Sequence, residues 1–142
     1  MRFLLDTDHL SILQAPLSPA QTAILTRIAN HPPADFAVSI ISFHEQFLGA
    51  HSTVSRARTP AAVVRGYDRM VHLRTDYQAM QVIPFDGPAA MVFDTFQAER
   101  IRVGTMDLRI AAIALSRGLI VLTRNARDFS RVPGLQIQDW TV

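Results

Sequence analysis

Several acidic residues of this chain follow short apolar segments, where they could hold a divalent metal ion. Asp6 ends the first such segment, Glu45 follows the second, and Asp128 comes shortly after a later one. Asp107 opens a segment with helical spacing. Carboxylates that converge repel one another unless a cation lies among them. Hard oxygen ligands select Mg²⁺ or Mn²⁺, and such an ion activates a water molecule for attack on a phosphate.

Helix capping is the competing interpretation for most of these acids. Residues Ser42–Glu45 have the spacing of a capping box, and Asn125–Asp128 have the same spacing with Asp in place of Glu. Asp107 is placed to be a simple N-terminal cap. Asp6 differs from the others because it ends an apolar strand, where an unpaired buried charge is costly unless something positive compensates it.

The composition excludes several kinds of chemistry. The chain has 142 residues, 49% of them hydrophobic, and we expect one domain over residues 1–142. All 14 basic residues are Arg, so a Lys-dependent phosphate loop and a Schiff base are excluded, and the absence of Cys excludes thiolate chemistry. The five His show no metal-ligand spacing. The net charge of +2 says little about nucleic-acid binding, so the positions of the Arg residues matter more.

The elements that must position these acids alternate along the chain. Short apolar segments predict strands at residues 2–5, 36–40, 81–84 and 119–123, with a further strand at 136–138. Helical spacing predicts helices at residues 20–29, 43–50, 61–80, 89–101 and 108–116. This order predicts an α/β fold with a mostly parallel sheet between helical layers. Ligands of such sheets bind beyond the carboxyl ends of the strands, where the acids lie.

Four segments resemble, in order and spacing, the motifs of PIN-domain ribonucleases, and among these the VapC-type toxins of bacterial toxin–antitoxin pairs. They are residues 3–8, 39–45, 103–112 and 122–129, and the tail at 132–140 is also similar. The resemblance implies a three-layer α/β/α PIN-like domain with a central sheet of four to five strands. It also implies an endoribonuclease that is the toxin of a type II toxin–antitoxin pair.

The resemblance implies that Asp6, Glu45 and Asp107 hold a catalytic Mg²⁺ or Mn²⁺, and Asp128 matches a more variable fourth acid. A water activated by that metal then attacks an RNA phosphodiester bond. The polar residues expected near the acids are Thr7, Asp8, Thr105, Thr123 and Asn125. Many relatives have Asn where this chain has Asp8 and Arg124. Asp8 either adds negative charge near the metal or caps a helix that begins at His9.

Arginines in two regions are candidates to bind a partner. Arg124, Arg127 and Arg131 lie nearest to the acidic motifs, and we expect them to contact RNA phosphates. Five further arginines lie between residues 56 and 74, on either a solvated helix face or a binding surface. This region resembles the pair of helices that helps to clamp the antitoxin in VapC-like proteins. The resemblance also implies a homodimer.

Two other functions remain open at this stage. The segment Asp6-Thr7-Asp8 also resembles the motif of haloacid dehalogenase-like phosphatases, in which Asp6 would be the nucleophile. Alternatively, the chain is a PIN-like binding module without catalysis. A receiver domain is disfavoured because it needs a Lys. No apolar segment approaches the ~20 residues of a membrane span, and no signal peptide is present, so we expect a soluble cytoplasmic protein.

Overall fold

Five short strands form one sheet in the computed structural model, which describes all 142 residues. They are β1 (Phe3–Leu5), β2 (Phe36–Ser39), β3 (Val82–Ile83), β4 (Ile120–Leu122) and β5 (Ile137–Gln138). The strand order is β3-β2-β1-β4-β5, and every neighbouring pair is parallel. Leu5 aligns with Val38 in β2 and with Leu122 in β4. The carboxyl ends of the central strands therefore meet at one edge of the sheet.

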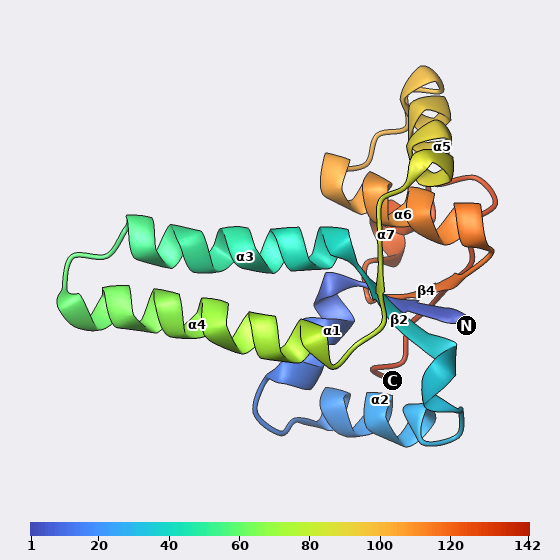
Figure 1. Cartoon of the computed structure of the whole chain (residues 1–142). Helices are drawn as coiled ribbons and strands as arrows, with labels where there is room; N and C mark the ends of the chain where they lie inside the picture. Colours follow the sequence, from blue (N-terminus) through green and yellow to red (C-terminus); the bar gives the residue numbers. More distant parts are fainter.

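Helices cover both faces of this sheet. They are α1 (Thr7–Gln14), α2 (Pro19–Ile28), α3 (Ile40–Ser55), α4 (Pro60–Gln78), α5 (Gly87–Ala98), α6 (Thr105–Arg117) and α7 (Ala126–Phe129), with a 3₁₀ turn at Pro33–Asp35. Figure 1 shows α5 and α6 on one side of the sheet and α1 and α2 on the other. Helices α3 and α4 form an antiparallel hairpin that projects from this body.

The sheet has a hydrophobic core on each face. Leu4 and Val121 point into a cluster of 16 buried residues that includes Ile110 of α6. Phe3 and Leu5, on the opposite side of β1, belong to a second cluster of 10 buried residues that reaches α2 and α4. Both faces of a parallel strand are buried, so an apolar run such as residues 3–5 is the expected sequence for a central strand.

The predicted fold class is confirmed, and the differences from prediction lie mainly at the ends of helices. Each predicted helix is present, but α3 extends over residues 40–55, well beyond the predicted 43–50. The short helices α1 and α7 were indicated by possible caps, at Asp8 and at Asn125–Asp128, and not by helical spacing. No helix of the chain is both long enough and apolar enough to cross a membrane.

Candidate active site

Asp6 stands where β1 ends and α1 begins, and its side chain has a structural partner for each oxygen. The backbone N–H of Thr7 donates to Oδ1 at 2.7 Å, so Asp6 is the N-terminal cap of α1. The Thr123 hydroxyl, which follows β4, donates to Oδ2 at 2.8 Å. The side chain is held firmly and is only 4% exposed. The parallel register of β1 and β4 brings Asp6 and Thr123 together across 117 residues of sequence.

Glu45 reaches the same edge from the second turn of α3. The Thr7 hydroxyl donates to Glu45 Oε1 at 2.8 Å and lies 2.9 Å from the hydroxyl of the buried Ser42. The predicted capping box at residues 42–45 is wrong. The N-cap of α3 is Ser39, whose hydroxyl accepts the N–H of Ser42 at 3.2 Å, so the helix begins one turn earlier. Glu45 is therefore not occupied by capping.

Asp107 is the third residue of α6, and its prediction as a helix cap is also wrong. The N-cap position belongs to Gly104, which has no side chain to accept a hydrogen bond. The side-chain amide of Asn125 donates to Asp107 at 3.4 Å and to Asp128 at 3.1 Å. Asn125 also caps α7 by accepting the N–H of Asp128, as its spacing predicted. One amide thus links two acids from different helices.

The negative charges of these acids act on one another. The pKa of Asp6 is raised from 3.8 to about 7, mainly by burial and in part by the nearby charges of Asp107 and Glu45, against the hydrogen bonds from Thr123 and Thr7. Burial also raises the pKa of Asp107 to about 6, together with the charges of Glu45 and Asp128. The excess of negative charge therefore favours either a proton or a bound cation at this position.

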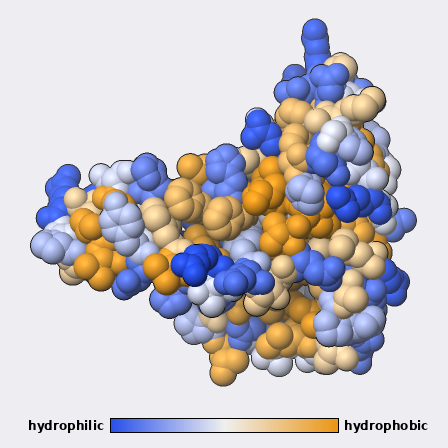
Figure 2. Space-filling model, viewed as in Figure 1, coloured by the Kyte–Doolittle hydropathy of each residue, from blue (hydrophilic) through white to orange (hydrophobic).

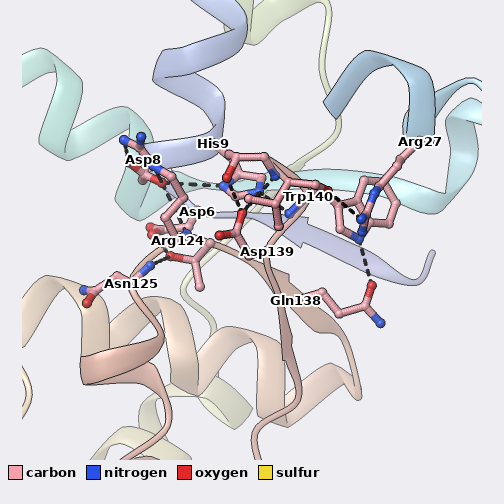
Figure 3. Close-up of polar contacts among 12 residues, drawn as sticks. Asp6, Asp8, His9, Arg27, Arg124, Asn125, Gln138, Asp139 and Trp140 are labelled. Carbon is pink, nitrogen blue, oxygen red and sulfur yellow. Dashed lines mark hydrogen bonds and ion pairs between the residues drawn. The ribbon is translucent and has the colours of Figure 1, made fainter. Parts of the chain in front are cut away.

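A pocket of about 430 Å³ lies at this edge of the sheet, and no apolar residue lines it. Its lining residues are Asp6, Thr7, Asp8, Glu45, Asp107, Arg124 and Asn125. Figure 3 shows the side chains of four of these gathered beside the end of β1. Asp128 and Thr123 do not line the pocket but contact residues that do, whereas Thr105 is exposed and makes no side-chain hydrogen bond.

Of the three arginines that were expected to contact RNA, only Arg124 lines the pocket. Its guanidinium pairs with Asp8 at 2.7 Å, and this pairing lowers the pKa of Asp8 although burial opposes the shift. Asp8 does not cap a helix that begins at His9, because α1 begins at Thr7 and Asp6 is its cap. Arg127 is exposed and outside the pocket. Arg131 donates instead to the carbonyl of Arg102, at 2.9 Å.

Three polar residues that support the site were not predicted from the sequence to do so. Ser42 and His9 are fully buried, and Gln46 is nearly so. Gln46 accepts the hydroxyl of Tyr77 at 2.8 Å and donates to Gln14 at 2.6 Å, so it joins α3 to α4 and α1 beside Glu45. The available signal was a polar residue at a helix position facing the core, which requires hydrogen-bond partners that only the fold can supply.

Comparison with proteins of known name identifies the family. No family model matches the chain. The tRNA(fMet)-specific endonuclease VapC of Shigella flexneri is 31% identical over 145 residues, which cover 99% of both chains. The chain belongs to the VapC family. Ribonuclease VapC2 of Haemophilus influenzae is 30% identical over 142 residues, covering 99% of this chain and 98% of that relative.

Solved VapC structures share the fold over nearly the whole chain. A VapBC complex from nontypeable Haemophilus influenzae superposes with a TM-score of 0.77 at 22% identity, covering 100% of both chains. A DNA-bound VapBC complex from Salmonella typhimurium gives 0.75 at 26% identity, covering 99% of this chain and 98% of that one. These findings confirm the predicted PIN-like α/β fold and a ribonuclease of the VapC type. They give no support to the phosphatase alternative.

Proposed function

We propose that this VapC protein is a metal-dependent endoribonuclease that cleaves RNA phosphodiester bonds in the acidic pocket. The observation that carries the proposal is the convergence of Asp6, Glu45 and Asp107 on one polar pocket from three separate elements. The raised pKa values of Asp6 and Asp107 support it, because burial and the neighbouring carboxylates both disfavour the ionised acids, and a divalent cation would offset this.

The residues of the pocket suit Mg²⁺ or Mn²⁺ bound through water. No three acidic or histidine side chains are close enough together to hold one ion directly. Mg²⁺ usually keeps several of its waters and uses one or two carboxylates, and the pocket, with its wholly polar lining, has room for such a hydrated ion. Asp6 and Asp107 are the first ligands we expect, with Glu45 placed to bind the waters. Asp128 does not line the pocket and contacts it through the Asn125 amide.

The protein's contribution to the reaction is to hold these acids in place. Thr7 and Thr123 fix both oxygens of Asp6, and Asn125 fixes Asp107 and Asp128 with one amide. A bound divalent cation would lower the pKa of a water and neutralise charge on the scissile phosphate. Because the acids are already oriented by hydrogen bonds, little rearrangement is needed when the ion and RNA arrive.

The test is cleavage of RNA by the purified protein with and without divalent metal. We expect Asp107→Asn to abolish Mg²⁺- or Mn²⁺-dependent cleavage while the fold stays intact by circular dichroism. Asp94→Asn is the matched control, because Asp94 is an exposed acid of α5 outside the pocket. Cleavage by Asp107→Asn at the parent rate would contradict the proposed site.

The same measurements separate the alternatives. A binding module without catalysis would leave RNA intact under all conditions, and Mn²⁺ titration would detect no site that depends on Asp6 and Asp107. A phosphatase would form a phosphorylated Asp6 that can be trapped and would act on phosphomonoesters. We expect RNA cleavage that requires metal and no phosphorylated protein.

We further propose that a cognate antitoxin binds the α3–α4 hairpin. The structural relatives are VapBC complexes, and the hairpin here exposes apolar residues and borders a groove. Val64, Tyr67 and Val71 are exposed apolar residues whose spacing puts them on one face of α4. A groove of about 760 Å³ between α1 and α4 is lined in part by Arg65 and Arg69. Together these offer apolar contacts and guanidinium groups, beside the carboxylates of Asp68 and Asp76 in the same groove, for a protein partner that carries both charges.

The protein encoded by the adjoining reading frame is the partner to test. We expect it to co-purify with this chain and to inhibit RNA cleavage, and Tyr67→Ala to weaken both effects. Exposed Leu17 lies outside the hairpin, so Leu17→Ala serves as an apolar control. Failure of the two proteins to associate would contradict an antitoxin partner from that reading frame.

We also propose a homodimer. Ile40, Phe47 and Leu48 are partly exposed and share one face of α3. Figure 2 shows apolar surface gathered where the hairpin meets the rest of the molecule. Such contiguous apolar surface is typical of a protein interface. The chain has a mass of 15.8 kDa, so light scattering distinguishes a dimer from a monomer directly, and Leu48→Asp should shift the protein towards monomer.

A further inference from the structure

The acidic pocket contains one cation among its lining residues. Arg124 stands beside Asp6, Asp8, Glu45 and Asp107, and no other Arg or His lines the pocket. An RNA phosphate that approaches these carboxylates is repelled by them at short range. Any attraction from a protein cation within the pocket must therefore come from Arg124.

The ion pair with Asp8 leaves part of the Arg124 guanidinium free. Its Nε donates to both oxygens of Asp8, at 3.2 Å and 3.0 Å, and Nη2 donates to Oδ1 at 2.7 Å. Nη1 has no partner, and the side chain is 53% exposed. The backbone N–H of Arg124 also donates to Asp8, at 3.3 Å, so Asp8 ties the loop after β4 to α1. One edge of a planar fork is thus fixed while the other faces solvent.

A buried histidine also contacts Asp8. His9 Nε2 accepts the backbone N–H of Trp140 at 3.1 Å, so its ring proton lies on Nδ1. Nδ1 is buried without a hydrogen bond of its own and faces the Asp8 carboxylate at 3.5 Å. Figure 3 shows this order of contacts, from the C-terminal segment through His9 to Asp8 and Arg124. These contacts connect Asp8 to Trp140, near the end of the chain.

We propose that Arg124 binds an RNA phosphate next to the scissile one, and that Asp8 is the positioning residue that aims its free edge. The inference rests on the proposed ribonuclease function and adds a specific residue to it. Arg suits this role because its remaining N–H groups can bind phosphate while Nε and Nη2 stay on Asp8. Asp8 and Arg124 thus act as a unit.

Binding of RNA without cleavage tests the role of Arg124. A short single-stranded RNA of mixed sequence is titrated against Asp107→Asn protein, with and without Arg124→Gln. We expect Arg124→Gln to weaken binding about tenfold, as loss of a hydrogen bond to a charged group would. The slope of log K against log salt should fall by about 0.7, the amount for one phosphate contact with a single strand. Unchanged affinity and slope would overturn the proposal.

Arg117→Gln is the matched control for that measurement. Arg117 is also exposed and also pairs with an aspartate, Asp86, at 3.1 Å. It ends α6, about 15 Å along the helix from Asp107, so it cannot reach a phosphate in the pocket. We expect its substitution to leave RNA affinity and the salt slope unchanged. An equal effect of both substitutions would mean that only overall charge matters, which would overturn the proposal.

A double-mutant cycle with Asp8→Asn separates positioning from simple charge. Removal of a carboxylate near RNA should tighten binding when only charge acts. In the Arg124→Gln background we expect Asp8→Asn to tighten RNA binding about twofold. With Arg124 present we expect Asp8→Asn to weaken binding about threefold, because the guanidinium loses its orientation. The same tightening in both backgrounds would overturn the positioning role of Asp8.

Cleavage kinetics keep this inference separate from the proposed function. In protein with Asp107 intact, Arg124→Gln should raise KM about tenfold and change kcat by less than about twofold, because a flanking phosphate is held equally in the ground and transition states. If the parent protein does not cleave RNA, the proposed function fails, and the binding cycle still measures the Arg124 contact. If cleavage is normal and Arg124→Gln leaves KM unchanged, only the present inference fails.

Discussion

Replacement of Asp6 by Asn should stabilise the metal-free protein while it removes a proposed metal ligand. The pKa of Asp6 rises from 3.8 to about 7 on folding, mainly because the carboxyl is buried. Ionisation of Asp6 in the folded state therefore opposes folding by about 4 kcal/mol above pH 7. The introduced amide must rearrange its contact with Thr123, which offsets ~1–2 kcal/mol of the stabilisation. We expect a net stabilisation of about 2–3 kcal/mol at pH 8.

The sign follows from the direction of the shift. Between pH 4 and pH 7 the unfolded chain has ionised Asp6 while the folded protein still binds its proton, so stability falls as the pH rises through this range. The penalty is about 2 kcal/mol at pH 5 and about 4 kcal/mol at pH 8. Burial lowers the pKa of His9 and produces the opposite slope below pH 6.5, but that slope is common to both proteins. The difference between parent and Asp6→Asn therefore reports the Asp6 carboxyl together with its coupling to Asp107 and Glu45.

Urea denaturation in EDTA at pH 5 and pH 8 measures this difference. The stability advantage of Asp6→Asn should grow by about 2 kcal/mol between the two pH values, with no change in the dependence on urea. Asp8→Asn is the control. Because Arg124 lowers the pKa of Asp8, this carboxyl is ionised in both the folded and the unfolded protein throughout this range. Addition of Mg²⁺ or Mn²⁺ at pH 8 should stabilise the parent far more than Asp6→Asn. A constant difference from pH 5 to pH 8 would refute the argument.

Two further predictions concern the hairpin that carries Glu45. A Cβ on Gly66 would lie 2.5 Å from Val54 Cγ2, so Gly66→Ala should lower the free energy of unfolding by about 1–2 kcal/mol. A Cβ on Gly49 has room, so Gly49→Ala should raise the free energy of unfolding by ~0.5–1 kcal/mol. Thermal melting measures both variants, and equal shifts in Tm would contradict this prediction. Tyr77→Phe leaves Gln46 without its hydroxyl donor, and we expect a loss of ~1 kcal/mol, or a fall of ~2–4 °C in Tm; an unchanged Tm would show that the buried hydrogen bond contributes nothing.

Much of the site could be predicted because its residues lie at strand ends. Asp6 follows an apolar run that can only be a central strand, so its position at the carboxyl edge was implied by the sequence. Thr123 was placed near the acids for the same reason, and its hydroxyl does contact Asp6. Local patterns of this kind work because strand alternation and helix periodicity depend on neighbouring residues.

Predictions that depended on which residue begins a helix were less successful. The pattern at residues 42–45 fitted a capping box, but the hydroxyl that caps α3 belongs to Ser39, and Ser42 turns inward to meet Thr7. Asp107 likewise looked like a cap, but Gly104 holds the N-cap position, and the Asp107 carboxylate lines the pocket and accepts the Asn125 amide. Several local caps are possible in such segments, and packing against the sheet selects one of them.

The sequence by itself determined the fold class and the acids that meet at one edge of the sheet, because both follow from periodicity and from the order of strands and helices. Only the tertiary structure decided that Arg124 is paired with Asp8 while Arg127 and Arg131 lie outside the pocket. It also decided that His9 is buried between Asp8 and the C-terminal segment. These contacts join residues more than 100 positions apart, and no local spacing contains the geometry that brings them together.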